Sequence, residues 1–383
     1  MNINSLIYKK LKRETSSGFF IPEIDGLRFL AIFIVVIFHI QLFFVAKTPY
    51  AFSYDGVLYR LIGNGFKGVE MFFVVSGFIL ALPFAKFFLL GLKKPNLKHY
   101  YYRRLTRLEP PYFIALVIFF VLHMIKGVYP TRDLFNGLIQ NIFYIQNLAP
   151  FQHFQAMIGN ITWTLEVEVQ FYLIAPFLAY VFSLKKISRR LMMIISIIIL
   201  SILNSSIIFD YVTLYAYLNY FLIGFLIADL YIIDRKTWFN KMGDFFVGFL
   251  ALAVFLLIDV NPVVDKIIFQ VALFVLVYSA LTGGFWRAVY GNKVLTTIGG
   301  MCYSLYLLHT VIISGIGNKT VLWQISNNYL INIIFQILLM LPCILVISGV
   351  YFILIEKPCM YKDWPIKIKN KIKLYYLRLA AVS

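Results

Sequence analysis

The chain is 383 residues long, 61% of them hydrophobic and 14% charged, with a formal net charge of +18 at pH 7. Soluble domains carry about 45–50% apolar and about 25% charged residues, so an ordinary water-soluble fold is excluded. The lysines and arginines gather in short clusters between apolar blocks, which is typical of membrane proteins and argues against nucleic acid as a partner. The spacing of Cys302, Cys343 and Cys359 fits neither a disulfide framework nor a metal site, so we expect no metal.

The apolar blocks are about 20 residues long, the length of a helix that crosses a bilayer. Backbone groups inside lipid need internal hydrogen-bond partners, so these blocks are expected to be helices. We predict an all-α integral membrane protein, a bundle of about ten transmembrane helices with both termini cytoplasmic. The first block is too long for the apolar core of a signal peptide. The expected spans, in chain order, are 27–46, 68–92, 111–129, 162–183, 191–209, 212–233, 243–259, 267–284, 295–316 and 329–355.

The basic clusters indicate the orientation of the chain. With the N-terminus in the cytoplasm, the inner segments hold most of the lysines and arginines, as the positive-inside rule requires. We therefore expect a cytoplasmic N-terminal segment (1–26), one transmembrane domain (27–358) and a basic cytoplasmic tail (359–383). Basic residues are attracted to anionic lipid, so the tail is expected to lie along the inner leaflet.

The first span carries two ionisable residues, Arg28 and His39, and an ionisable residue inside a span is a functional candidate because it is costly there. They are eleven residues apart, which puts both on one face of a helix and separates them by about 16 Å along its axis. An arginine at the cytoplasmic mouth suits a phosphate, and a deep histidine suits proton transfer. The gap matches an extended pantetheine arm, which favours acyl-coenzyme A as a ligand. The alternatives are a positive-inside anchor for Arg28 and a structural bundle histidine for His39.

Two further arginines, Arg104 and Arg107, precede the third span and are three residues apart, so they share a helical face. Together with the neighbouring tyrosines they could hold phosphates and stack on an adenine ring. The alternative is a positive-inside run with an aromatic belt.

The remaining candidates lie toward the outer side of the predicted bundle. Glu70 opens the second span, and Glu166 and Glu168 follow Trp163 near the outer end of the fourth. Residues two apart point about 200° away from each other on a helix, so at most one glutamate of this pair faces a given site. His309 lies in the outer half of the ninth span. Arginines at the inner mouth and acids and histidines farther out suit transfer of a group from an inner donor to an outer acceptor.

Six segments together resemble the acyltransferase type 3 family of membrane O-acyltransferases. Arg28 with His39 is similar to that family's Arg-x10-His motif, and Arg104 with Arg107 is similar to its Arg-x-x-Arg motif. The match runs in order through nearly the whole chain. The segments are Ile24–Arg28 with His39, Gly68–Phe78, Arg104–Arg107, Trp163–Tyr172, Tyr303–His309 and Glu356–Pro358.

This resemblance implies an acyl-coenzyme A donor, usually acetyl-coenzyme A, and a hydroxyl acceptor on an extracytoplasmic glycan or glycolipid such as peptidoglycan, capsule or lipopolysaccharide. It implies a multi-pass protein of the bacterial cytoplasmic (inner) membrane. Carried over by motif, Arg28, Arg104 and Arg107 bind the donor, and His39, Glu168 and His309 are the catalytic candidates. Candidate substrate-binding residues at the other motif positions are Glu70, Trp163, Glu166, Tyr303 and Ser304.

The chain departs from the family pattern in two places. Many members have a second acid directly after the conserved glutamate, whereas Val169 stands there and Glu166 lies two residues before Glu168. Some members carry a soluble esterase-like domain after the last span, so any such step here either comes from a separate extracytoplasmic partner or does not occur. Two other functions are alternatives. One is a transporter or flippase for a lipid-linked sugar, but the paired half-repeats typical of transporters are not found in the sequence. The other is a non-catalytic membrane subunit or sensor.

Overall fold

The computed structural model describes residues 8, 10–14, 20–50, 52–54, 56–127, 129–148, 158–159, 161–206, 213–260, 262–367 and 370. Its regular structure in this part of the chain is helical, which confirms the all-α class. The helices are α2 (Pro22–Lys47), α3 (Val57–Gly63), η1 (Asn64–Lys67), α4 (Gly68–Leu90), α5 (Leu97–Lys126), α6 (Thr131–Ile142), α8 (Trp163–Leu178), η3 (Ala179–Ser183), α9 (Lys186–Ser206), α10 (Leu214–Ile233), α11 (Lys241–Leu257), α12 (Val263–Thr282), α13 (Trp286–Tyr290), α14 (Lys293–Gly300), α15 (Cys302–Thr320), α16 (Tyr329–Tyr351), η4 (Phe352–Glu356) and α17 (Lys357–Met360).

Within the described residues, eight helices are long and apolar enough to cross a membrane, or nine if α14 and α15 form one broken span. The protein is therefore a multi-pass membrane protein, with fewer clear spans than the ten expected. The expected span 243–259 is α11, whose 17 residues reach only about 26 Å, short of a hydrocarbon core of about 30 Å. The expected span 295–316 bends by 68° between α14 and α15, directly after Gly299 and Gly300, which weaken a helix.

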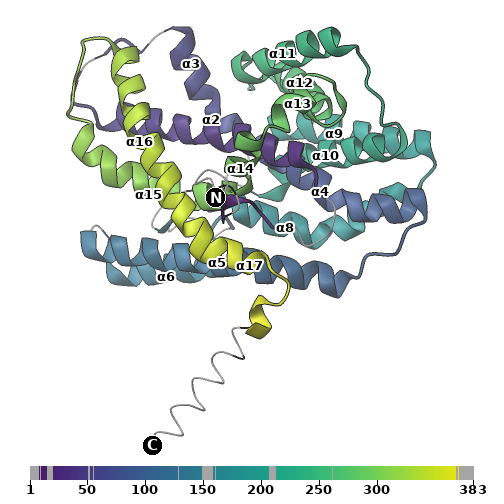
Figure 1. Ribbon diagram of the computed structural model, residues 1–383, viewed down its shortest axis with the longest axis horizontal. Helices are drawn as coiled ribbons and strands as arrows, with labels where there is room; N and C mark the ends of the chain where they lie inside the picture. The colour runs from purple at the N-terminus through teal and green to yellow at the C-terminus, as the bar shows by residue number, and fades with distance from the viewer. Residues whose placement is uncertain are drawn as a thin grey trace, which may run out of the picture.

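Helix α2 lies in the middle of the molecule (Figure 1), with α15 and α16 on one side and α9 to α12 on the other. Two apolar cores meet along it. Leu27 and Ala31 belong to a core built mainly by α4, α8, α10 and α12. Ile32 and Val36 belong to a second core built mainly by α5, α15 and α16. The polar residues of α2 are therefore held between two packed bodies rather than facing lipid.

Glycines allow the closest helix approaches. At the crossing of α4 and α10, a Cβ on Gly224 would lie 2.3 Å from the carbonyl oxygen of Val74, so the two backbones are in contact. Small residues play this part in membrane helix pairs because hydrocarbon offers no hydrophobic drive between helices. A Cβ on Gly299 would lie 1.7 Å from the carbonyl oxygen of Asp25, so α14 presses directly on the start of α2.

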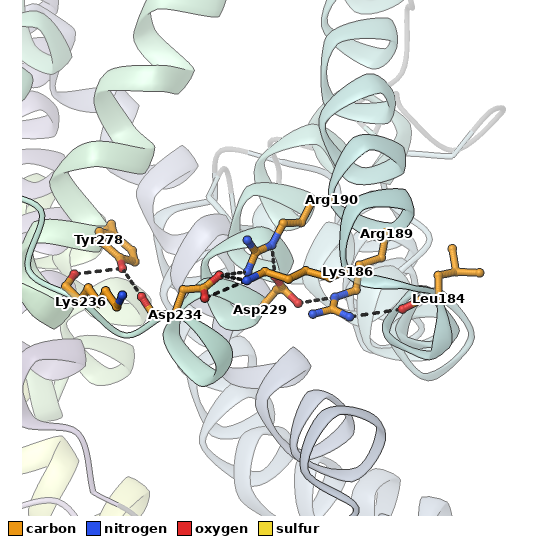
Figure 2. Close-up of polar contacts among 8 residues, drawn as sticks. All are labelled: Leu184, Lys186, Arg189, Arg190, Asp229, Asp234, Lys236 and Tyr278. Carbon is orange, nitrogen blue, oxygen red and sulfur yellow. Dashed lines mark hydrogen bonds and ion pairs between the residues drawn. The ribbon is translucent and has the colours of Figure 1, made fainter.

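An ion-pair network, which we call the α9–α10 network, joins the start of α9 to the end of α10 (Figure 2). The fully buried carboxylate of Asp229 accepts from Arg189 Nε and Arg190 Nε, each at 2.5 Å. Asp234 accepts from Arg190 Nη2 at 2.5 Å and from Lys186 Nζ at 2.8 Å. These hydrogen bonds lower the pKa of Asp234 below its usual value. Each of these five charged groups thus forms at least one ion pair within the network.

Candidate active site

The two histidines of the motifs lie against each other. The rings of His39 on α2 and His309 on α15 have centroids 4.9 Å apart and an interplanar angle of 74°. The Nδ1 of His39 is 2.8 Å from the carbonyl oxygen of Val35, and that of His309 is 2.7 Å from the carbonyl oxygen of Tyr306. A carbonyl only accepts, so in the neutral rings Nδ1 carries the hydrogen and Nε2 holds a free lone pair. His309 Nε2 is buried without a hydrogen-bond partner.

Arg28 and His39 both face α15, as the helical spacing predicts. His39 contacts His309, and the guanidinium of Arg28 interacts electrostatically with Cys302. Positions 302 and 309 are seven residues, or close to two turns, apart and so share a face of α15. The arginine and the imidazole pair therefore line one side of the α2–α15 interface.

The arginine end of this interface is a cluster of five charged residues, Arg13, Asp25, Arg28, Arg107 and Glu356, which we call the arginine cluster. Asp25 Oδ1 accepts from Arg13 Nη1 at 2.6 Å and from Arg28 Nη1 at 2.9 Å, while its Oδ2 is buried and unbonded. Arg107 interacts electrostatically with the other four. It makes no hydrogen bond or ion pair with any residue the structure describes. One guanidinium of the cluster therefore remains available to a ligand anion.

Glu356 connects the two last family segments. Its buried Oε2 accepts from the backbone N–H of Ser304 at 3.0 Å and from the hydroxyl of Ser304 at 2.5 Å. Ser304 lies in the first turn of α15, where backbone N–H groups lack partners within the helix. The bend after α14 thus creates a helix N-terminus beside the arginines, and such a terminus attracts negative charge. Glu356 holds it in place.

A cavity of about 220 Å³ is lined by residues of α5, α8 and α15 together with Tyr144. Arg104 lines it and lies flat on the ring of Tyr100, with its guanidinium carbon 3.7 Å from the ring centroid and 5.3 Å from that of Tyr172. Such stacking leaves part of the planar guanidinium available for bidentate hydrogen bonds. The polar residues around the cavity are Tyr101, Arg104, Glu109, Tyr144, Glu168, Tyr172 and Tyr303.

The two glutamates of α8 face in different directions, as their spacing requires. Glu168 lines the cavity, accepts from Ser76 Oγ at 2.8 Å and interacts electrostatically with Arg28. Glu166 is fully buried and accepts from the backbone N–H and the side-chain amide of Asn147 at 3.0 and 2.9 Å. Glu168 is therefore the glutamate that faces the cavity. Glu166 instead connects α8 to the segment after α6 through its hydrogen bonds with Asn147.

Two candidates from the sequence lie apart from the imidazole pair. Glu70 is buried in the first turn of α4, and its electrostatic neighbours are Lys67 and Lys266. Trp163 stacks near Tyr217, with ring centroids 5.4 Å apart, and does not line the cavity. Of the late motif positions, Tyr303 reaches the cavity and donates to the carbonyl oxygen of Leu108 at 3.0 Å.

The fold brings three residues to the site that no sequence motif marks: Arg13, Glu109 and Tyr144. Arg13 looked like one more basic residue of a positive-inside cluster, and only the fold places it on Asp25. Glu109 lines the cavity and accepts from the hydroxyl of Tyr144 at 3.0 Å. Glu109 lies two residues before the predicted span 111–129 and Tyr144 lies in a connecting segment, so neither stood out as an ionisable residue inside a span.

Comparison with known proteins decides the family. The family described as an acyltransferase domain matches residues 21–352. The chain belongs to this acyltransferase family. The match covers both histidines and three of the five members of the arginine cluster, so the resemblance drawn from the six segments is confirmed.

Several curated proteins of Staphylococcus aureus and Listeria are similar to the chain. The O-acetyltransferase OatA of Staphylococcus aureus strain NCTC 8325 is 27% identical over 367 residues, covering 87% of this chain and 57% of that protein. A Staphylococcus aureus strain COL protein with a provisional O-acetyltransferase name is 27% identical, covering 80% and 52%. The Listeria monocytogenes peptidoglycan O-acetyltransferase OatA is 30% identical over 185 residues, covering 45% and 26%.

The chain spans about half the length of the curated relatives it matches. No solved structure is significantly similar to it.

Proposed function

We propose that the protein is an O-acyltransferase of the bacterial cytoplasmic membrane that takes an acyl group, by default acetyl, from acyl-coenzyme A on the cytoplasmic side. The acceptor is a hydroxyl of an extracytoplasmic glycan or glycolipid. The observation that carries this proposal is the contact between the rings of His39 and His309, where the buried Nε2 of His309 has no hydrogen-bond partner. The two rings lie on the same faces of α2 and α15 as Arg28 and Cys302. Both the family and the names of the relatives support O-acyl transfer.

The donor is held by positive charge. Arg107 forms no hydrogen bond or ion pair with the described residues, and Arg28 is bonded to a single carboxylate oxygen. Phosphates of coenzyme A bind such an arrangement because guanidinium groups form paired, charge-assisted hydrogen bonds to them. Arg104, stacked on Tyr100, continues the basic surface into the cavity. With both termini cytoplasmic, this end of the protein faces the pool of acyl-coenzyme A.

His39 performs the transfer by one of two routes. As a general base, its Nε2 accepts the proton of the acceptor hydroxyl while that oxygen attacks the thioester carbon, the C–S bond breaks and the thiolate leaves. As a nucleophile, Nε2 itself attacks the thioester carbon, the thiolate leaves, and the acyl group then passes to the hydroxyl. On the general-base route His309 Nε2 accepts from a neighbouring hydroxyl of the acceptor, because the single proton of the reacting hydroxyl goes to His39. On the nucleophile route His309 Nε2 takes the proton of the attacking hydroxyl as the bond between the acyl carbon and His39 Nε2 breaks. On both routes Glu168 orients the groups between donor and imidazole.

The test uses the purified protein in lipid nanodiscs with acetyl-coenzyme A, measuring free thiol release and transfer to envelope glycans by mass spectrometry. We expect His39→Ala to lose roughly 10²–10⁴-fold in rate, the range for a general acid–base group. His309→Gln is expected to lose roughly tenfold or more for the same reason.

His123→Ala is the matched control for both variants. His123 lies on α5 and makes the same Nδ1 contact, 2.8 Å to the carbonyl oxygen of Phe119, but it faces Tyr129 instead of a second histidine. It should retain full activity. Full activity in His39→Ala, with normal thermal stability, would refute the proposed function.

A further inference from the structure

A group of aromatic side chains, which we call the outer aromatic cluster, lies at the end of α2 far from the arginines. It consists of Phe44 on α2, Phe52, Tyr54 and Tyr59 from the segment between α2 and α4, and Tyr329 at the start of α16. The ring of Tyr329 is the centre, with centroids 5.4 Å from Tyr54, 5.6 Å from Tyr59 and 6.2 Å from Phe44. Tyr54, Tyr59 and Phe52 are partly exposed, whereas Phe44 and Tyr329 are buried.

Two polar atoms beside these rings are buried without a partner. The side chains of Tyr329 and Gln41 are each 4% exposed. The Tyr329 hydroxyl and Gln41 Oε1 form no hydrogen bond, although Gln41 Nε2 donates to the carbonyl oxygen of Tyr59 at 3.2 Å. A buried polar group without a partner is destabilising, and native structures keep such a group where something else satisfies it.

The cluster begins a short distance beyond the imidazole pair. Phe44 follows His39 by five residues on the same helix, which is a rise of about 8 Å. The direction is away from Arg28, toward the side from which the acceptor arrives. A group held at the cluster therefore cannot be the reacting group itself, but a neighbouring unit of the same chain reaches His39.

We propose that the outer aromatic cluster binds a sugar unit of the acceptor glycan that is adjacent to the unit being acylated. This inference rests on the proposed function and names a second acceptor subsite within it. A sugar has an apolar C–H face and a rim of hydroxyls. Half-exposed aromatic rings offer a partner for the face, and the Tyr329 hydroxyl and Gln41 Oε1 offer partners for the rim.

The burial of the Tyr329 hydroxyl argues against a membrane-interface belt as the explanation. Belt tyrosines place their ring in the interface and their hydroxyl in water or among head groups. Tyr50 resembles that pattern more closely, since it is partly exposed and its hydroxyl donates to the carbonyl oxygen of Leu322 at 3.0 Å. The hydroxyl of Tyr329 instead is a donor and acceptor without a hydrogen-bond partner, and aromatic side chains surround its residue.

The experiment measures acetyl transfer in nanodiscs to chito-oligosaccharides from the monosaccharide to the hexasaccharide. For the unaltered protein, KM should fall once the oligosaccharide is long enough to reach both His39 and the cluster. Tyr329→Phe should raise KM for the hexasaccharide roughly 3–10-fold, the effect of one lost hydrogen bond. Tyr54→Ala should raise it roughly tenfold through lost ring contact. Both variants should treat the monosaccharide as the unaltered protein does.

Tyr50→Phe is the matched control. It also removes one tyrosine hydroxyl from this end of the protein, but a hydroxyl whose partner is the protein backbone. It should lower the melting temperature slightly and leave the length dependence intact, whereas Tyr329→Phe should leave the melting temperature unchanged or higher.

The inference is overturned if KM is independent of length in the unaltered protein, if none of the oligosaccharides is acylated, or if Tyr329→Phe and Tyr54→Ala preserve the length dependence. In each case His39-dependent acylation of envelope glycans can persist, so failure of this inference is distinguishable from failure of the proposed function.

Discussion

The α9–α10 network and the arginine cluster have the same charges but different bonding. Each contains three cations and two carboxylates. In the α9–α10 network every charged group is bonded to another, and Asp229 uses both oxygens. In the arginine cluster, Arg107 is bonded to no described residue and Asp25 leaves one oxygen unused. The matched charges join α9 to α10, whereas the incompletely bonded cluster is the one to which we assign the donor phosphates.

The largest effect should come from breaking the matched network. In Asp229→Asn the buried guanidinium of Arg189 loses its counter-ion, while the partly exposed guanidinium of Arg190 keeps only Asp234. Losing one partner of a buried ion pair costs about 3–5 kcal/mol. Thermal unfolding in detergent should show this loss, while the specific activity of the protein that remains folded stays normal. A large fall in specific activity without destabilisation would contradict the division between the two clusters.

The opposite result is expected in the arginine cluster. Arg107→Gln removes a cation that is hydrogen-bonded to no described residue and that lies near two other arginines, so stability should hold or rise. A hydrogen bond to a charged group contributes about 1.5–3 kcal/mol, so KM for acetyl-coenzyme A should rise roughly 10–100-fold. Acetyl-pantetheine, which lacks the nucleotide phosphates, is the control donor, and its KM should be equal for both proteins. An equal rise for both donors would show that Arg107 does not bind phosphate.

The smallest effect concerns the exposed edge of the α9–α10 network. Lys186 and Arg190 lower the pKa of Asp234, so the unfolded chain binds its proton at higher pH than the folded one. The stability from this carboxylate is present above its usual pKa of 3.8 and is lost as pH falls below that value. Asp234 is 33% exposed, so Asp234→Asn should cost less than about 1 kcal/mol at neutral pH.

Unfolding midpoints measured between about pH 6 and about pH 3 check this sign. The difference between Asp234→Asn and the unaltered protein should shrink toward the acid end. A difference that grows on acidification would contradict the assignment of Asp234 to the network.

Helical periodicity made part of the site predictable. The shared face of Arg28 and His39, and the divergence of Glu166 from Glu168, follow from 100° per residue and hold in the structure. The pattern could not decide which glutamate faces the site, because the partner of Glu166 is Asn147 in a connecting segment. Contacts between distant segments leave no periodic pattern in the sequence. The ion pair of Arg13 with Asp25 is such a contact and could not be predicted for the same reason.

The fold class was predictable from apolar block length, but the helix breaks were harder to predict. The interruption at Met301 follows two glycines that a hydropathy pattern counts as neutral, and it places a helix N-terminus beside the arginines. Hydropathy measures transfer into lipid and is insensitive to such a bend. It likewise treats the 17-residue α11 as one more span.

The bond from Glu356 to Ser304 has a consequence for biogenesis. Ser304 begins α15, whereas Glu356 follows α16, so the ribosome makes the capping carboxylate after nearly all of the membrane domain has been inserted. A nascent chain that already holds Arg28 and His39 in the membrane therefore still lacks the group that secures the end of α15. The N-terminus of α15 therefore gains its side-chain cap only after α16 has been synthesised.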